Sequence, residues 1–180
     1  MSAGSMETFA ILLRGVMPRG RNRVPMAELR AALSRAGLQD VQTYIQSGNV
    51  VARSRRDPAG IQALVHEAIA REIGADIAVI ARTHRQLRDV LEGNPFPRAD
   101  AAPTYFSLLA SEPAAARVDQ LRRVDVSPDF VEVAGDMIYT RYATKLSDSK
   151  FTNNFFERKL KVVATTRNFN TLSRLVELSA

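Results

Sequence analysis

The order of apolar segments most constrains the fold of this 180-residue chain, because one arrangement of expected strands and helices occurs twice. Runs of β-forming residues predict strands, and apolar residues spaced three and four apart predict helices. In the first copy the expected strands are 7–16, 41–45, 50–53 and 77–81, with helices through Leu29, Val65 and Leu87. In the second copy the expected strands are 104–109, 130–134, 137–142 and 162–164, with helices through Leu121, Phe155 and Leu172.

Each copy has the order β-α-β-β-α-β followed by one more helix, which is the order of a ferredoxin-like unit. We therefore predict an α+β fold with two tandem ferredoxin-like units, mainly antiparallel sheets and helices packed on one face. The expected bounds are 6–92 for the first unit, 93–103 for a linker rich in proline, and 104–180 for the second unit with its C-terminal helix.

Turn and cap residues support this division of the chain. Residues 47–49 (Ser-Gly-Asn) predict a hairpin between two strands, because glycine and asparagine tolerate positive φ. Asp57 and Pro58 are expected to begin a helix as cap and first residue. Ser147 or Asp148 is the expected cap of the helix that carries Phe155.

Composition excludes several classes of protein. The chain has no cysteine, which rules out disulfides and thiolate chemistry and favours a cytoplasmic location. No apolar run is long enough for a membrane span, so no membrane partner is expected. The net charge is +6, and residues 1–60 alone carry nine arginines against four acidic residues. This balance favours an anionic partner, either nucleic acid or a phosphate-bearing small molecule.

The ferredoxin-like order predicts where polar loops meet. In the first copy, the loop after the first strand and the 47–49 hairpin are expected at the same end of the sheet. The candidate ligand-binding residues there are Arg14, Arg21, Asn22, Tyr44, Ser47 and Asn49. For the hairpin residues, a purely structural role in the turn stays open.

In the second copy, the loop 144–150 is expected to face the residues that follow the 162–164 strand. The candidate anion-binding residues are Lys145, Lys150, Thr166, Arg167 and Asn168. Helix N-termini at this place would add exposed N–H groups. Thr166 precedes Leu172 by six residues, whereas Thr83 precedes Leu87 by four, which suggests two extra polar residues at this junction. Helix capping is the alternative role for these side chains.

Other site chemistry lacks support in the sequence. His66 and His84 are the two histidines, and neither has a second ligand at metal-binding spacing, so no metal is expected. There is no nucleophile-elbow sequence and no glycine-rich phosphate loop, so no cofactor is expected.

Three segments resemble one known family. They are LLRGV…GRNRVPMAELRAAL (12–33), TYIQSGNVV (43–51) and ATTRNFNTL (164–172). In order and spacing they are similar to the family known as domain of unknown function 1697. The resemblance implies an uncharacterised, mostly bacterial α+β fold. The chain departs from the family pattern at residues 17–20, where Asn-Val-Gly-Gly is usual, and at Phe169, where tryptophan is usual.

Three functions stay open. The leading hypothesis is a cytoplasmic protein that binds an anionic ligand, nucleic acid or nucleotide-like, through its basic loops. The first alternative is an enzyme that acts on a phosphorylated or carboxylated small molecule in a groove between the units, with Tyr44 or Asp148 handling protons. The second alternative is a protein-interaction module. The sequence decides neither whether the chain is an enzyme nor its oligomeric state.

Overall fold

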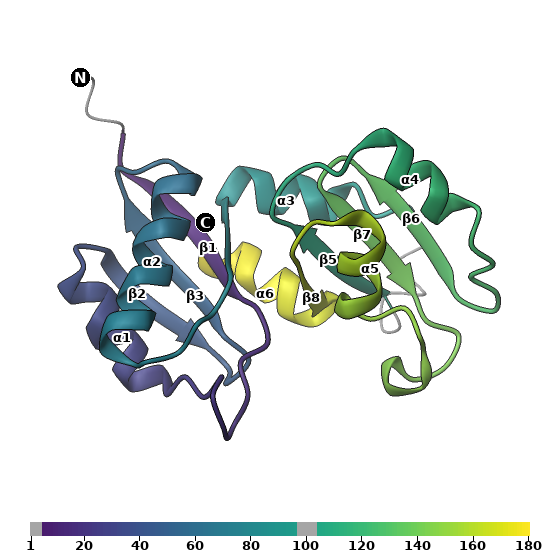
Figure 1. Cartoon of the computed structure of the whole chain (residues 1–180). Helices are drawn as coiled ribbons and strands as arrows, with labels where there is room; N and C mark the ends of the chain where they lie inside the picture. Colours follow the sequence, from purple (N-terminus) through teal and green to yellow (C-terminus); the bar gives the residue numbers. More distant parts are fainter. Residues whose placement is uncertain (1–4, 97–103) are drawn as a thin grey trace. The chain divides into compact units, whose positions relative to one another are not determined.

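The structure is a computed structural model that describes residues 5–96 and 104–180. The first half contains β1 (Glu7–Leu13), α1 (Met26–Arg35), β2 (Gln39–Tyr44), β3 (Asn49–Ser54), α2 (Pro58–Glu72), β4 (Val79–Thr83) and α3 (His84–Glu92) (Figure 1). The second half contains β5 (Thr104–Leu109), α4 (Ala115–Arg122), β6 (Phe130–Ala134), β7 (Met137–Arg141), a short 3-10 helix (Leu146–Asp148), α5 (Asn153–Leu160), β8 (Ala164–Asn168) and α6 (Phe169–Leu178). Within these residues, no helix has the length and apolar character needed to cross a membrane.

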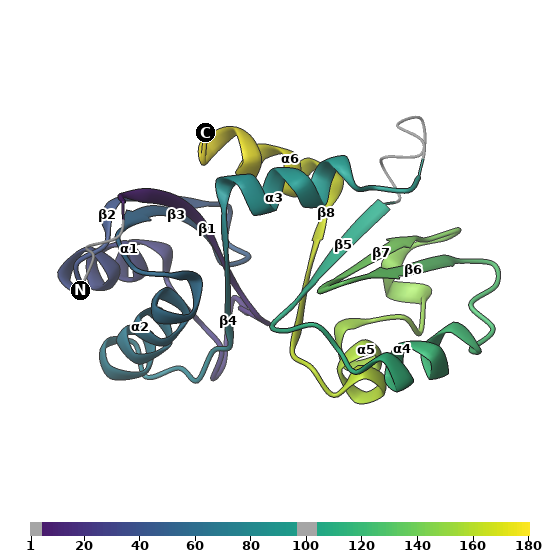
Figure 2. The same cartoon turned by 90° about the horizontal axis from the view of Figure 1, so that it is seen from above.

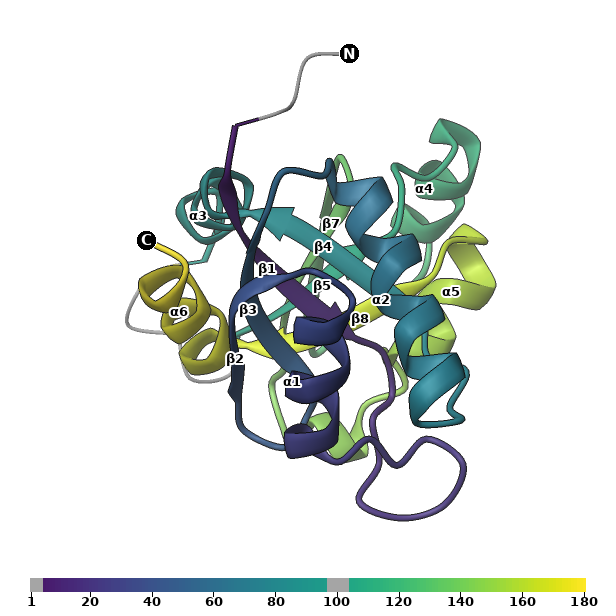
Figure 3. The same cartoon turned by 90° about the vertical axis from the view of Figure 1, so that its left-hand side faces the viewer.

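The two sheets have the same strand order. The first is β2-β3-β1-β4 and the second is β6-β7-β5-β8, and every pairing is antiparallel. In Figure 3 α1 and α2 lie side by side on one face of the first sheet. In Figure 2 α4 and α5 lie together on one face of the second. The predicted fold class, two tandem ferredoxin-like units, is confirmed.

Alternation along the strands builds each core. Phe9, Ile11 and Leu13 of β1 point to the helix-covered face and pack in the core with Leu29 of α1 and Val65 of α2. In the second unit the buried aromatic rings of α5 and the residue Phe151 just before it pack against the sheet. Both cores therefore follow from side chains two apart on a strand and three or four apart on a helix.

The pairings of the central strands β1 and β5 are equivalent in the two sheets. Leu13 pairs with Val79 and Phe9 with Thr83, while Leu109 pairs with Ala164 and Tyr105 with Asn168. At the end of the central strand, the Leu13 N–H donates to the Gly48 carbonyl (2.8 Å), and the Leu109 N–H donates to the Asp136 carbonyl (2.9 Å). The repeat is thus one of backbone geometry.

The described chain divides into two compact units. The first comprises the residues up to Asp89 together with Arg174–Ala180, and the second comprises Val90–Ser173. This division assigns the end of α6 to the first unit, whereas the predicted bounds place it in the second. Within the first unit, His84 Nδ1 and Ser179 Oγ lie 3.1 Å apart and join the start of α3 to the end of α6. Most of the predicted linker, residues 97–103, lies outside the described residues.

Two predicted boundaries in the second unit are wrong. The helix predicted to begin at Ser147 or Asp148 begins at Asn153, because the Ser149 hydroxyl binds the Asp129 carboxylate (2.8 Å) and the Phe151 N–H (3.1 Å) and keeps the chain extended. The strand predicted at 162–164 is β8, which runs from Ala164 to Asn168. Its threonines are strand residues, consistent with their β-branched side chains.

Gly48 is expected to be the glycine least tolerant of substitution in the first unit. Its φ is +82°, and an added Cβ would lie 2.7 Å from Leu13 Cβ and from Val16 Cγ2. Because overpacking costs roughly 1–3 kcal/mol beyond the backbone strain, Gly48→Ala should lower the free energy of unfolding by about 3 kcal/mol. Gly20→Ala is the matched control, since its φ is +83° with nothing within 4 Å. Urea unfolding that shows equal losses for both variants would contradict the packing argument.

Candidate functional site

The loop between β1 and α1 folds back on itself. Met17 forms a bridge with Arg23, and the Met17 N–H donates to the Asn22 carbonyl (2.9 Å). The Asn22 side-chain amide donates to the Gly15 carbonyl (3.2 Å) and draws the two ends of the loop together. The loop is therefore held by its own backbone, with Asn22 as an internal brace.

The β2–β3 turn, residues 45–48, is held by one buried amide. Asn49 is fully buried, and its Nδ2 donates to the Tyr44 carbonyl (3.1 Å) and to Ser47 Oγ (2.9 Å). Asn49 thus stabilises the turn through hydrogen bonds from a buried side chain. Tyr44 is half-buried, whereas Ser47 is exposed. The hydrogen bonds of Asn49 to Tyr44 and Ser47 give these residues a structural role in the turn, which the sequence had left open.

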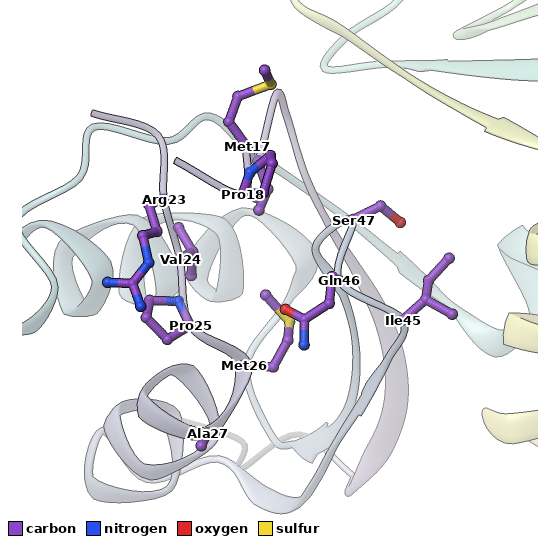
Figure 4. A pocket seen from close by; sticks show the side chains of 11 residues that line it. Met17, Pro18, Arg23, Val24, Pro25, Met26, Ala27, Ile45, Gln46 and Ser47 are labelled. Atoms are coloured by element: carbon purple, nitrogen blue, oxygen red, sulfur yellow. The ribbon is translucent and has the colours of Figure 1, made fainter. Parts of the chain in front are cut away.

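A pocket of about 810 Å³ lies between this loop and this hairpin (Figure 4). The predicted meeting of the β1–α1 loop with the hairpin is therefore observed. The pocket is lined by Val16, Met17, Pro18, Arg23, Val24, Pro25, Met26, Ala27, Ile45, Gln46 and Ser47. In Figure 4 the side chains of Gln46 and Met26 point toward one another between the two segments.

The pocket is more apolar than the predicted polar rim. Of the six residues predicted in the first unit, Ser47 lines it, whereas Arg14, Arg21, Asn22, Tyr44 and Asn49 do not. Sequence reasoning missed the apolar lining because methionine, proline and valine in a basic loop were not considered as a site. The sequence carried one signal, the large apolar residue Met17 within the polar loop that follows the first strand. In the structure Met17 and Ile45 are both at least half-exposed.

Charge gathers beside the pocket. Arg19, Arg21 and Arg23 are exposed, and none of them forms an ion pair within the part of the chain that the structure describes. Arg23 belongs to the lining itself, and its neighbours in the loop carry no acidic residue between Arg14 and Ala27. The site thus combines an apolar interior with unneutralised guanidinium groups.

Ile45 has a backbone conformation that its side chain disfavours. Its φ is +51°, and its side chain is half-exposed at the pocket. A β-branched residue in the left-handed region is an outlier that costs on the order of 1–3 kcal/mol. Because the Ile45 side chain is half-exposed, the free energy gained by its burial offsets little of this cost. An isoleucine at this place therefore points to a role other than stability.

Replacing Ile45 is expected to stabilise the protein. Asparagine tolerates the left-handed region, so Ile45→Asn should raise the free energy of unfolding by about 0.5–1 kcal/mol, as measured by urea unfolding. Val163→Asn is the control, since Val163 is 37% exposed at an ordinary φ and gains nothing from the change. A loss of stability in Ile45→Asn would show that the side chain packs more tightly than its exposure suggests.

The residues predicted in the second unit do not form a loop site. Thr166, Arg167 and Asn168 are residues of β8, and the Asn168 side chain accepts from the Thr171 N–H (2.8 Å) as the cap of α6. Asn168 pairs with Tyr105 of β5, and Thr83 pairs with Phe9, the equivalent residue of β1. Asn168 is therefore the counterpart of Thr83. Leu87 and Leu172 lie four positions after Thr83 and Asn168, respectively, so the two extra residues inferred from the sequence do not exist.

Thr166 and Arg167 are engaged inside the unit. Thr166 Oγ1 donates to Asn153 Oδ1 (2.6 Å) and lies 2.6 Å from Ser107 Oγ. Arg167 is buried and donates to Thr165 Oγ1 and the Thr166 carbonyl (both 2.9 Å). Burial lowers the pKa of Arg167 to about 10, which leaves it charged at neutral pH. Lys145 and Lys150 are exposed.

Arg82 is the counterpart of Arg167 in the first unit. It is also buried, and it donates to the carbonyl of the preceding residue, Ala81 (3.0 Å). Each arginine is followed by the cap residue and, four positions beyond the cap, by a buried leucine. This spacing was a repeat signal that the sequence comparison of the two copies missed.

The cap role of Asn168 gives a direct test. Loss of a helix cap costs about 1 kcal/mol, so Asn168→Ala should lower the free energy of unfolding by that amount in thermal or urea denaturation. Asn168→Ser or Asn168→Asp, which keep an acceptor, should restore most of it. If alanine is neutral, the hydrogen bond to Thr171 does not stabilise α6.

A second hollow lies in the first unit, between α1 and the end of α2. It has a volume of about 590 Å³ and is lined by Arg35 and Glu72, which pair with each other. The Arg35 and Arg71 side chains hold the pKa of Glu72 below its usual range. Across residues 5–96 and 104–180, no three histidine or acidic side chains gather to hold a metal ion.

Comparison with known proteins identifies a family and a similar fold. The model of a family described as "protein of unknown function (DUF1697)" matches residues 6–139. The conserved bacterial protein SP0830 from Streptococcus pneumoniae has a similar fold, with a TM-score of 0.75 and 20% identity over 98% of this chain and 100% of that chain. At this identity the likeness shows the fold alone. No curated protein matches the chain.

Proposed function

Because the chain belongs to the DUF1697 family, whose function is unknown, we propose a function from its pocket: the first unit binds a small nucleotide-like anion. The observation that carries this proposal is the apolar pocket between the β1–α1 loop and the β2–β3 hairpin, with unpaired arginines beside it. An apolar interior with a few polar groups is the usual character of a small-molecule site.

The size and lining of the pocket suit a ring with an attached phosphate. Its volume of about 810 Å³ lies within the usual range for small-ligand sites. Met17, Pro18 and Ile45 are the exposed apolar residues of the lining and offer contacts to a ring. Gln46 has both a donor and an acceptor for the polar edge of a base. The guanidinium of Arg23 would then bind the phosphate through two N–H groups.

Binding without catalysis accords best with the lining. No aspartate, glutamate, histidine, lysine or tyrosine lines the pocket, so it lacks a group for general acid–base catalysis. Ser47 accepts a hydrogen bond from the Asn49 side chain. Tyr44 lies outside the lining, and Asp148 belongs to the other unit. The enzyme alternative therefore lacks an observation in its favour.

Calorimetric titration with four probes tests the proposal. We expect AMP and ATP to bind saturably, and adenosine and inorganic phosphate to bind much more weakly, because each of these two fills only one part of the site. The double variant Arg21→Gln/Arg23→Gln should weaken AMP binding roughly 10- to 100-fold, the usual effect of losing hydrogen bonds to a charged group.

A variant of equal charge separates the site from the general field. Arg55 and Arg56 are exposed and lie outside the pocket lining, so Arg55→Gln/Arg56→Gln should leave AMP binding within about twofold. Equal weakening by the two double variants, or no saturable binding by the wild-type protein at millimolar AMP, would refute the proposal.

A further inference from the structure

The lysines of this protein are confined to one segment. All four, Lys145, Lys150, Lys159 and Lys161, fall within 17 consecutive residues of a chain in which arginine is otherwise the basic residue. All four are exposed. None of them, nor Arg158 beside them, forms an ion pair within the described part of the chain. We name Lys150, Arg158, Lys159 and Lys161 the α5 basic surface.

A buried pair of aromatic rings brings three of these cations together. Lys150 Nζ lies 5.2 Å from the centre of the Phe151 ring, and the Phe151 and Phe155 rings are 5.1 Å apart, edge to face. The Arg158 guanidinium carbon and Lys159 Nζ each lie 5.9 Å from the Phe155 ring. The faces of aromatic rings attract cations. Three positive groups therefore surround one aromatic pair.

The acidic residues of the segment are too few to balance its basic residues. Glu157 is half-buried and accepts a hydrogen bond from the Ala164 N–H (2.9 Å). Asp148 accepts one from Ser147 Oγ (3.1 Å). Between residues 145 and 161 there are five basic and two acidic residues, a local balance of +3. The surface keeps its positive charge.

Lys161 has a backbone conformation that favours glycine. It ends α5 with a φ of +61°. Glycine is the usual residue at this position of a helix, because a side chain is strained there. A lysine has a favourable interaction with the helix dipole, but Lys159 in the last turn already provides one. As at Ile45 in the first unit, a strained residue lies at a candidate binding surface.

We propose that the α5 basic surface binds the phosphate backbone of nucleic acid. Phe151 and Phe155 beneath this surface are buried, so neither ring is free to stack on a base. Sequence-independent binding to a duplex is therefore expected to be at least as tight as binding to a single strand. An anionic membrane is less favoured, because attachment to a membrane needs several apolar side chains to insert. The exposed large apolar residue nearest in the sequence is a single valine, Val163. This surface belongs to the second unit, and the inference does not depend on the nucleotide pocket.

Fluorescence anisotropy with a labelled 20-base-pair duplex, the corresponding single strand and phosphatidylglycerol vesicles tests the proposal. At about 50 mM salt we expect the quadruple variant Lys150→Gln/Arg158→Gln/Lys159→Gln/Lys161→Gln to bind the duplex at least ~10-fold more weakly than wild type. The magnitude of the slope of log K against log salt should decrease by about 3.6, since each of the four lost phosphate contacts removes about 0.9.

The control removes the same charge elsewhere. Arg55, Arg56, Arg117 and Arg123 are exposed, and the four-fold Arg→Gln variant of these residues should bind the duplex within about threefold of wild type. Lys161→Gly serves as a second probe, because it should raise the melting temperature while it weakens duplex binding. Equal losses in the two quadruple variants, no duplex binding by wild type, or tighter binding to vesicles than to duplex would overturn the proposal. AMP titration of the quadruple variant should match wild type, which separates this proposal from the one on the pocket.

Discussion

The contact between the end of the central strand and the adjacent hairpin is the constraint on which the rest of each unit depends. In the first unit Leu13 donates to the Gly48 carbonyl, and Gly48 packs against Leu13 and Val16 where a side chain would overlap them. This contact fixes how the hairpin approaches the β1–α1 loop, and the pocket is the space left between them. The second unit repeats the bond with Leu109 and Asp136, although its hairpin has a two-residue turn.

Local rules gave most of the architecture. The order of the elements was predicted, β5 has the predicted bounds, and Asp57 caps α2 by accepting from the Gly60 N–H (2.8 Å) as its position before Pro58 indicated. These features depend on neighbouring residues, which sequence shows directly. The predicted meeting of loop and hairpin followed from topology, which also needs no knowledge of side-chain packing.

Predictions failed where distant residues decide the outcome. The sequence predicts Thr166 and Arg167 in a polar loop after the strand, but pairing with β5 makes them strand residues and buries the arginine. Asn49 was a candidate ligand contact, yet long-range packing buries it completely. The apolar character of the pocket was also missed, because the prediction considered only the polar residues of the two segments that line it. The binding roles of the predicted residues stay predictions.

The confinement of lysine to residues 145–161 has a practical consequence for chemical work on this protein. Side-chain amines are the groups that acylating dyes, crosslinkers and activated sensor surfaces attack, whereas guanidinium groups do not react with them. Apart from the amino terminus, such reagents would modify a single segment of the second unit. Attachment through amines would therefore hold the protein in nearly one orientation and obstruct that segment, while leaving the arginine-rich loop of the first unit unmodified.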